Sequence, residues 1–124
     1  MMVAGFGEIV SNKGVFASEQ DALDNVLRRL VDAFDPQSVW LFGSRARGQA
    51  RPDSDFDLLF VAKPGGRFGS GDYETVFEPL RGLGVGCDIV PCSASDFVEG
   101  AEIKTSLVAQ VLANGRKLYD AEAR

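Results

Sequence analysis

Apolar residues recur at three- and four-residue intervals in two stretches of the chain, the spacing that places side chains on one face of a helix. The first stretch follows Ser18, which with Asp21 resembles a capping box, and it ends at Asp35-Pro36. The second ends at Asn114-Gly115, in the usual manner of a helix C-terminus. Both are predicted to be amphipathic helices. Their apolar positions are Leu23, Val26, Leu27, Leu30, Val31 and Phe34, and Ile103, Leu107, Val108, Val111 and Leu112.

Shorter apolar runs between these helices have the length of β-strands. Residues 39–42, 56–61 and 85–90 are predicted strands, and residues 116–119 are predicted to add an edge strand. The run at 56–61 is apolar on both faces but polar at its beginning. We therefore expect a sheet that is buried on both sides, with one end in contact with water.

The remaining segments are shorter or less regular. Residues 73–83 are predicted to form a short helix that Pro79 disturbs, and residues 96–100 a helical turn. Residues 63–72 are rich in glycine, and a flexible connector is favoured over a loop that covers a nucleotide. This order of elements predicts an α+β domain with helices packed on a small mixed β-sheet.

Charged residues interrupt the apolar pattern most clearly between the first two predicted strands. Asp55 and Asp57 fall on one face of a strand, about 7 Å apart, because side chains alternate with period two. Two like charges repel each other, so this pair indicates a divalent cation bound between oxygen ligands. Gly43 allows a tight turn and Ser44 can cap the segment that follows, which makes an anion site suited to phosphate. A metal site close to a phosphate site indicates nucleotide chemistry.

These residues carry a family resemblance. Gly43-Ser44, ten intervening residues and then Asp55-x-Asp57 resemble the signature of the DNA polymerase β-like nucleotidyltransferase superfamily. Each part alone is commonplace, since a Gly-Ser pair is usually only a turn and an Asp-x-Asp is often merely exposed. The joint occurrence, in this order and at this spacing, favours a catalytic protein.

A longer stretch of the sequence resembles one particular branch of this superfamily. GSRARG at residues 43–48, followed by SDFDL at residues 54–58, is similar to the minimal nucleotidyltransferases, the small single-domain branch that includes antitoxins. Asp88 lies where members of the family carry a third carboxylate on a later strand. The resemblance covers about residues 20–120 and implies a single domain with the nucleotidyltransferase fold.

The resemblance also implies roles for these side chains. Asp55, Asp57 and Asp88 would hold one or two Mg²⁺ ions, and Asp88 would lie beside the acceptor hydroxyl as its proton acceptor. The chemistry implied is transfer of a nucleoside monophosphate, most simply AMP from ATP, with release of pyrophosphate.

The phosphate side of the site is implied in the same way. Gly43, Ser44 and neighbouring backbone N–H groups would hold the β- and γ-phosphates. Arg45 and Arg47 would neutralise the charge that builds on the leaving pyrophosphate, although a short helix can turn Arg47 outward.

Composition narrows the choice of ligand. The net charge of −5 disfavours long nucleic acid, whereas Arg45, Arg47 and Arg51 concentrate positive charge within seven residues and favour a small nucleotide. Histidine is absent, which excludes a Ser-His-Asp triad, a histidine base and imidazole metal ligands. Cys87 and Cys92 do not have the spacing of a zinc site and are interpreted as buried thiols.

A chain of 124 residues is most economically one domain. We expect an N-terminal arm at residues 1–17, the nucleotidyltransferase domain at 18–120 and a tail at 121–124. No apolar run reaches the length of a membrane span and no secretion signal is evident, so a cytoplasmic location is expected.

Three functions stay open at this point. The first is an active nucleotidyltransferase; the resemblance adds that such antitoxins modify a tyrosine of a small all-helical HEPN-type partner with AMP. The second is a non-catalytic module that masks its partner, and the third is a transferase acting on a small molecule such as an aminoglycoside. The three carboxylates favour the first over the second, and the absence of a second domain disfavours the third. The sequence is also compatible with an oligomer.

Overall fold

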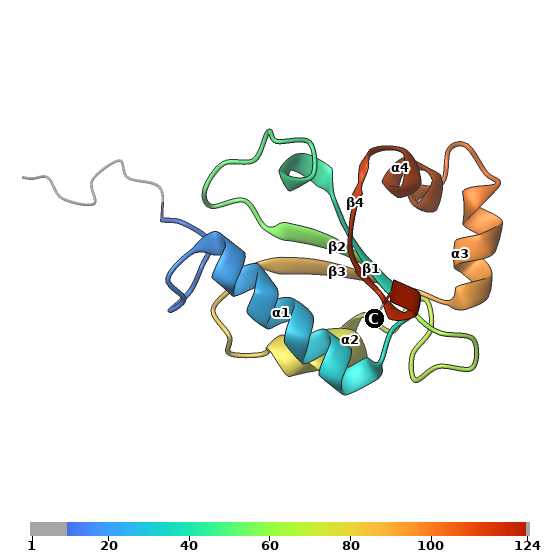
Figure 1. Ribbon diagram of the computed structural model, residues 1–124, viewed down its shortest axis with the longest axis horizontal. Helices are drawn as coiled ribbons and strands as arrows, with labels where there is room; N and C mark the ends of the chain where they lie inside the picture. Colours follow the sequence, from blue (N-terminus) through green and yellow to red (C-terminus); the bar gives the residue numbers. More distant parts are fainter. Residues whose placement is uncertain (1–9, 124) are drawn as a thin grey trace, which may run out of the picture.

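A mixed β-sheet forms the centre of the computed structural model, which describes residues 10–123 (Figure 1). Within that range the sheet has four strands in the order β3-β2-β1-β4. β1 pairs antiparallel with both β2 and β4, whereas β2 and β3 run parallel. The predicted mixed sheet is confirmed. The strands are β1 Ser38–Phe42, β2 Phe56–Val61, β3 Cys87–Cys92 and β4 Arg116–Asp120.

Helices cover both faces of this sheet. α1 (Glu19–Phe34) and α2 (Tyr73–Phe77), with the 3₁₀ turn Glu78–Leu80 that follows α2, lie on one face. α3 (Ala94–Ala101) and α4 (Leu107–Asn114) lie on the other (Figure 1). No helix among residues 10–123 is both long enough and apolar enough to cross a membrane.

Strand β2 is the centre of both hydrophobic layers. Phe56, Leu58 and Phe60 pack toward α1, while Leu59 and Val61 pack toward α3 and α4. All five are at most 3% exposed, and burying each such side chain stabilises the fold by about 1.5–3 kcal/mol. The expected burial on both faces is confirmed, and it anchors the strand whose beginning carries the acidic residues.

Several predicted boundaries are confirmed. The Ser18 hydroxyl accepts the N–H of Asp21 at 3.0 Å and caps α1, as expected. The expected turn near residue 96 is a full helix, α3, whose cap is Ser93, because the Ser93 hydroxyl accepts the N–H of Asp96. Strand β3 begins at Cys87, two residues later than predicted.

The prediction for the last helix was wrong in two respects. Ile103 precedes α4 and is 54% exposed, and Leu107 and Leu112 are 38% and 41% exposed, so only Val108 and Val111 of the predicted stripe are buried. Gly115 does not adopt the left-handed conformation typical of such a helix end, since its φ is −84°. Glycine is needed there because a Cβ would come within 2.6 Å of the Val111 carbonyl oxygen and 2.9 Å of the Leu41 carbonyl oxygen.

The predicted arm and tail fall partly outside the described range, which leaves out residues 1–9 and residue 124. The described part of the arm is in contact with the domain. The N–H of Asn12 donates to the Pro52 carbonyl at 2.8 Å, and the Ser11 hydroxyl donates to Glu19 on α1 at 2.5 Å.

Candidate active site

Two neighbouring strands, β2 and β3, bring the predicted acidic residues together at one end of the sheet. Asp55 comes directly before β2, and Asp57 is the second residue of that strand. The parallel register places Asp57 opposite Asp88 of β3, and the antiparallel register places it opposite Phe42, the last residue of β1. Residues paired across neighbouring strands point to the same face. Asp57 and Asp88 therefore face the same side, next to the turn that begins at Gly43.

This end of the sheet is open to solvent. Asp55 and Asp88 are exposed and Asp57 is partly buried, whereas Leu59, two residues further along the same face, is covered by the helices. Beside it a pocket of about 160 Å³ lies between the turn after β1 and helix α4. Its lining residues are Phe42, Gly43, Arg47, Leu107, Gln110, Val111, Asn114 and Gly115.

Two glycines make room for two of the carboxylates. Gly43 has a φ of +74°, and a Cβ at this position would overlap Oδ2 of Asp57. A Cβ at Gly86, the residue before β3, would overlap Oδ1 of Asp55. Each carboxylate thus lies directly against the backbone of a neighbouring strand. The importance of Gly43 was predicted, but that of Gly86 was missed, because only the pairing of β2 with β3 places it beside Asp55.

The electrostatics fit a bound cation. Burial raises the pKa of the Asp57 carboxyl above its ordinary value, and the negative charges of Asp88 and Asp55 raise this pKa further. Arg47 acts in the opposite direction and lowers the pKa of Asp57. Asp57 therefore lies close enough to Asp88 and Asp55 to be repelled by both, and the oxygen ligands that these carboxylates offer suit a hard divalent ion.

The carboxylates of Asp55, Asp57 and Asp88 do not surround a single metal position in this structure. Among residues 10–123, no three carboxylate or thiol side chains are gathered closely enough to hold one metal ion as they stand. Asp57 and Asp88 are already neighbours through the strand register, so rotation of their side chains is enough to bring the oxygens closer.

The turn after β1 differs in detail from expectation. A 3₁₀ turn spans Gly43–Arg45 and its N-cap position is Phe42, without a side-chain cap. The prediction that Ser44 caps this segment was wrong, because the turn begins at Gly43, two residues earlier than a cap at Ser44 requires, and Ser44 lies inside it. The N–H groups of Arg47 and Gln49 donate to the carbonyls of Gly43 and Ser44 at 3.2 and 2.9 Å, which closes the turn.

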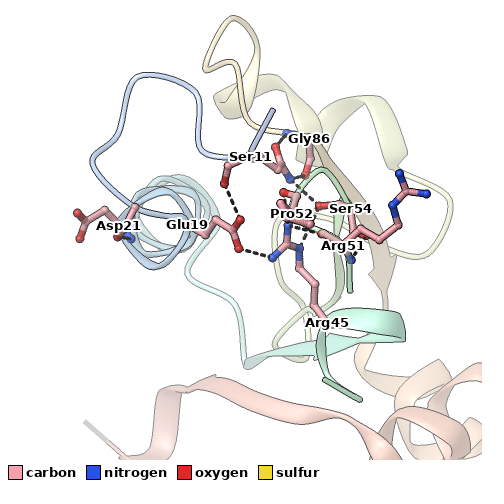
Figure 2. A network of polar contacts seen from close by, with 10 residues as sticks. Ser11, Glu19, Asp21, Arg45, Arg51, Pro52, Ser54 and Gly86 are labelled. Atoms are coloured by element: carbon pink, nitrogen blue, oxygen red, sulfur yellow. Dashed lines mark hydrogen bonds and ion pairs between the residues drawn. The ribbon is translucent and has the colours of Figure 1, made fainter. Parts of the chain in front are cut away.

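Arg45 is used to hold the loop between β1 and β2. Its side chain is only 10% exposed, and it donates to Glu19 Oε1 at 2.8 Å, to the Ser54 carbonyl at 2.8 and 3.0 Å and to the Pro52 carbonyl at 3.1 Å (Figure 2). The guanidinium also lies 4.3 Å from the ring centre of Phe56, on the α1 face of the sheet. Hydrogen bonds from Ser11 and then from Arg45 lower the pKa of Glu19.

The structure therefore separates the two arginines that the sequence places together. Arg45 lies with Phe56 on the face opposite Asp57, and its donors are occupied by the protein itself. Arg47 is exposed, lines the pocket beside α4 and acts on the charge of Asp57. Arg47, which the sequence suggests is turned outward, is thus the arginine available to a ligand at this end of the sheet.

Comparison with known proteins identifies the family. The family model of the nucleotidyltransferase domain matches residues 23–118. The chain belongs to this family. No curated protein was found to match it.

Solved structures of other proteins have a fold similar to that of this nucleotidyltransferase domain. A candidate nucleotidyltransferase from Sulfolobus solfataricus superposes with a TM-score of 0.56 at 20% identity, over 81% of this chain and 78% of that one. A toxin–antitoxin complex with AMP-PNP gives 0.52 at 21% identity, over 78% and 73%. The toxin–antitoxin pair MntA-HpeT, with two aspartates changed to glutamate, gives 0.50 at 19% identity, over 83% and 74%.

Proposed function

We propose that this nucleotidyltransferase transfers AMP from ATP to a hydroxyl group of a partner protein. The observation that carries the proposal is the meeting of Asp55, Asp57 and Asp88 at the open end of the sheet, beside the Gly43 turn. Support for the nucleotide and the partner comes from the similar fold of a toxin–antitoxin complex with AMP-PNP. A small all-helical partner of the HEPN type fits the proposal best.

In this proposal the three aspartates hold Mg²⁺, which when bound supplies positive charge to the triphosphate and to the attacking oxygen. Arg47 neutralises negative charge on the leaving pyrophosphate, in place of the pair of arginines expected from the sequence. Gly43 and Ser44 contact the phosphates through the turn. Arg45 acts indirectly by fixing the residues that lead into Asp55.

The chemical step balances with these groups. The acceptor oxygen attacks the α-phosphorus of ATP, a new phosphorus–oxygen bond forms, and the bond from the α-phosphorus to the oxygen that bridges to the β-phosphorus breaks. Pyrophosphate carries away the electron pair of that bond. The proton of the acceptor hydroxyl passes to Asp88, which is exposed on edge strand β3.

The test uses the purified chain, ATP, Mg²⁺ and the protein encoded beside it, with intact-mass measurement of that protein. We expect a gain of one or more AMP units with ATP and a much smaller gain with GTP, CTP or UTP. Asp55→Ala and Asp57→Ala should abolish the gain.

Asp53→Asn is the matched control, because Asp53 lies in the same loop and its one ion pair among residues 10–123 is with exposed Arg51 at 3.7 Å. It should transfer AMP at the unmutated rate. Transfer that persists in both Asp55→Ala and Asp57→Ala would refute the assigned metal ligands. A partner that is bound but never modified by the unmutated chain would instead favour the masking function.

A further inference from the structure

The side chain of Asn12 joins the two segments that carry the site carboxylates. Its Nδ2 donates to the Ser54 carbonyl at 3.0 Å and to the Gly86 carbonyl at 2.9 Å. Its Oδ1 accepts the N–H of Gly86 at 2.6 Å. Since Nδ2 has two hydrogens and Oδ1 accepts, these contacts use both ends of the amide in the only orientation that suits all three partners.

The contact with Gly86 has the form of a strand pairing. The Gly86 carbonyl also accepts the N–H of Phe56 at 3.0 Å, which is the hydrogen bond at the open end of the β2–β3 ladder. The Asn12 side chain adds one donor and one acceptor to Gly86. It therefore takes the place of a further paired residue at the end of the β2–β3 hydrogen-bond ladder. The backbone N–H of Asn12 fixes the other side by donating to the Pro52 carbonyl at 2.8 Å.

This arrangement controls the position of Asp55. Ser54 and Phe56 flank Asp55 in the chain, and the Gly86 backbone lies so close to Oδ1 of Asp55 that a Cβ would overlap it. Asn12 holds Ser54 and Gly86 at a fixed separation. Figure 2 shows Ser54 and Gly86 near each other, with the side chain of Arg45 directed toward Ser54. Without Asn12, the loop before β2 and the start of β3 lose their only shared side-chain partner among the contacts that the structure describes.

We propose that Asn12 is a positioning residue for the metal site, which acts by fixing the backbone on both sides of Asp55 and before Asp88. The proposal rests on the proposed function, because it assigns the ions to these aspartates. Asn12 lies outside the range 23–118 that the family model covers and within the segment expected to be an N-terminal arm. The arm would thereby become part of the active site.

The experiment measures Mn²⁺ affinity by calorimetry in the full-length chain without nucleotide, for the unmutated protein, Asn12→Ala and Ser11→Ala. Loss of a partner behind metal ligands typically weakens metal binding about 10–100-fold, and we expect at least about 10-fold for Asn12→Ala. Ser11→Ala is the matched control: it removes a hydrogen bond of the same arm, to Glu19, but no contact with Ser54 or Gly86. It should bind Mn²⁺ with the unmutated affinity.

An amide NMR spectrum of each sample reports folding separately, and the Gly86 N–H signal should move in Asn12→Ala and stay in Ser11→Ala. If alanine unfolds the chain, Asn12→Ser serves as the second variant, since its short hydroxyl cannot reach both backbone segments. Unmutated Mn²⁺ affinity in a folded Asn12 variant, or equal weakening by Ser11→Ala, would overturn the positioning role while leaving the proposed transfer standing. Absence of Mn²⁺ binding by the unmutated chain would overturn both.

Discussion

Replacing Gly43 with alanine should separate the shape of the site from the stability of the fold. The φ of +74° at Gly43 is a left-handed conformation that costs a residue with a Cβ about 1–2 kcal/mol. The added methyl group would also overlap Oδ2 of Asp57. We expect Gly43→Ala to lose about 1–2 kcal/mol of unfolding free energy and, in addition, to push the Asp57 carboxylate out of its position.

Gly48 provides a matched control for this variant. Its φ of +71° is nearly the same, but no atom lies within 4 Å of the place where its Cβ would be. Gly48→Ala should therefore show a similar loss of unfolding free energy, measured by urea denaturation, without disturbing Asp57. The difference between the two variants isolates the contact with the carboxylate.

Binding and transfer are then compared in the two folded variants. Gly43→Ala should bind Mn²⁺ at least about 10-fold more weakly than Gly48→Ala, which corresponds to about 1.4 kcal/mol, and AMP transfer should fall in parallel. Equal Mn²⁺ affinity and equal transfer in the two variants would refute the reasoning that the close approach of Asp57 to the turn shapes the site.

Three further predictions follow from the charges. The pKa of Asp57 is raised in the folded chain, so the folded state binds this proton more tightly and loses stability as pH rises above 3.8. Asp57→Asn should therefore unfold at a higher urea concentration than the unmutated chain at pH 7. The difference between the two urea midpoints should close as pH falls toward 3.8. Arg45→Ala should lower the unfolding free energy by about 2 kcal/mol, because the partly buried acceptors Glu19 and Ser54 lose a charged donor. Arg47→Ala should stay within about 0.5 kcal/mol of the unmutated chain in urea denaturation yet slow transfer. Burial raises the pKa of the Cys87 thiol to about 12, so iodoacetamide at pH 8 should leave Cys87 unmodified in the native chain and alkylate it in urea, as followed by mass spectrometry.

Much of the fold follows from local pattern. The period of two through β2 and the three- and four-residue spacing of α1 depend on nearby residues only, and both elements were predicted almost to their ends. The acidic pair of Asp55 and Asp57 was identified for the same reason, because repulsion on one strand face is a local property. The place of Asp88 needed the family resemblance, since its neighbour Asp57 is reached only through the parallel pairing of β2 with β3.

What sequence reasoning missed depends on contacts between distant residues. Asn12 is 42 positions from Ser54 and 74 from Gly86, and no spacing within the arm indicates such partners. A short helix can turn Arg47 outward, as the sequence indicates, but no sequence pattern shows that Glu19 and Phe56 hold Arg45 on the α1 face. The exposure of Leu112 likewise depends on how much of α4 the sheet covers. The helical spacing of apolar residues does not predict that coverage.

At one end of this domain, carboxylates that repel each other lie beside backbone segments that hydrogen bonds hold in place. The far end of β2 is wholly apolar and held by packing, whereas its beginning carries like charges that burial makes less favourable. Packing holds only the Phe56 face of that beginning, because the face of the carboxylates is open to solvent. The backbone carbonyls of Arg51, Pro52 and Ser54 are bound by Arg45 from the α1 face, and those of Ser54 and Gly86 by Asn12 from the arm. Since these restraints act on the main chain, the aspartate side chains keep the freedom to turn toward an ion that neutralises them.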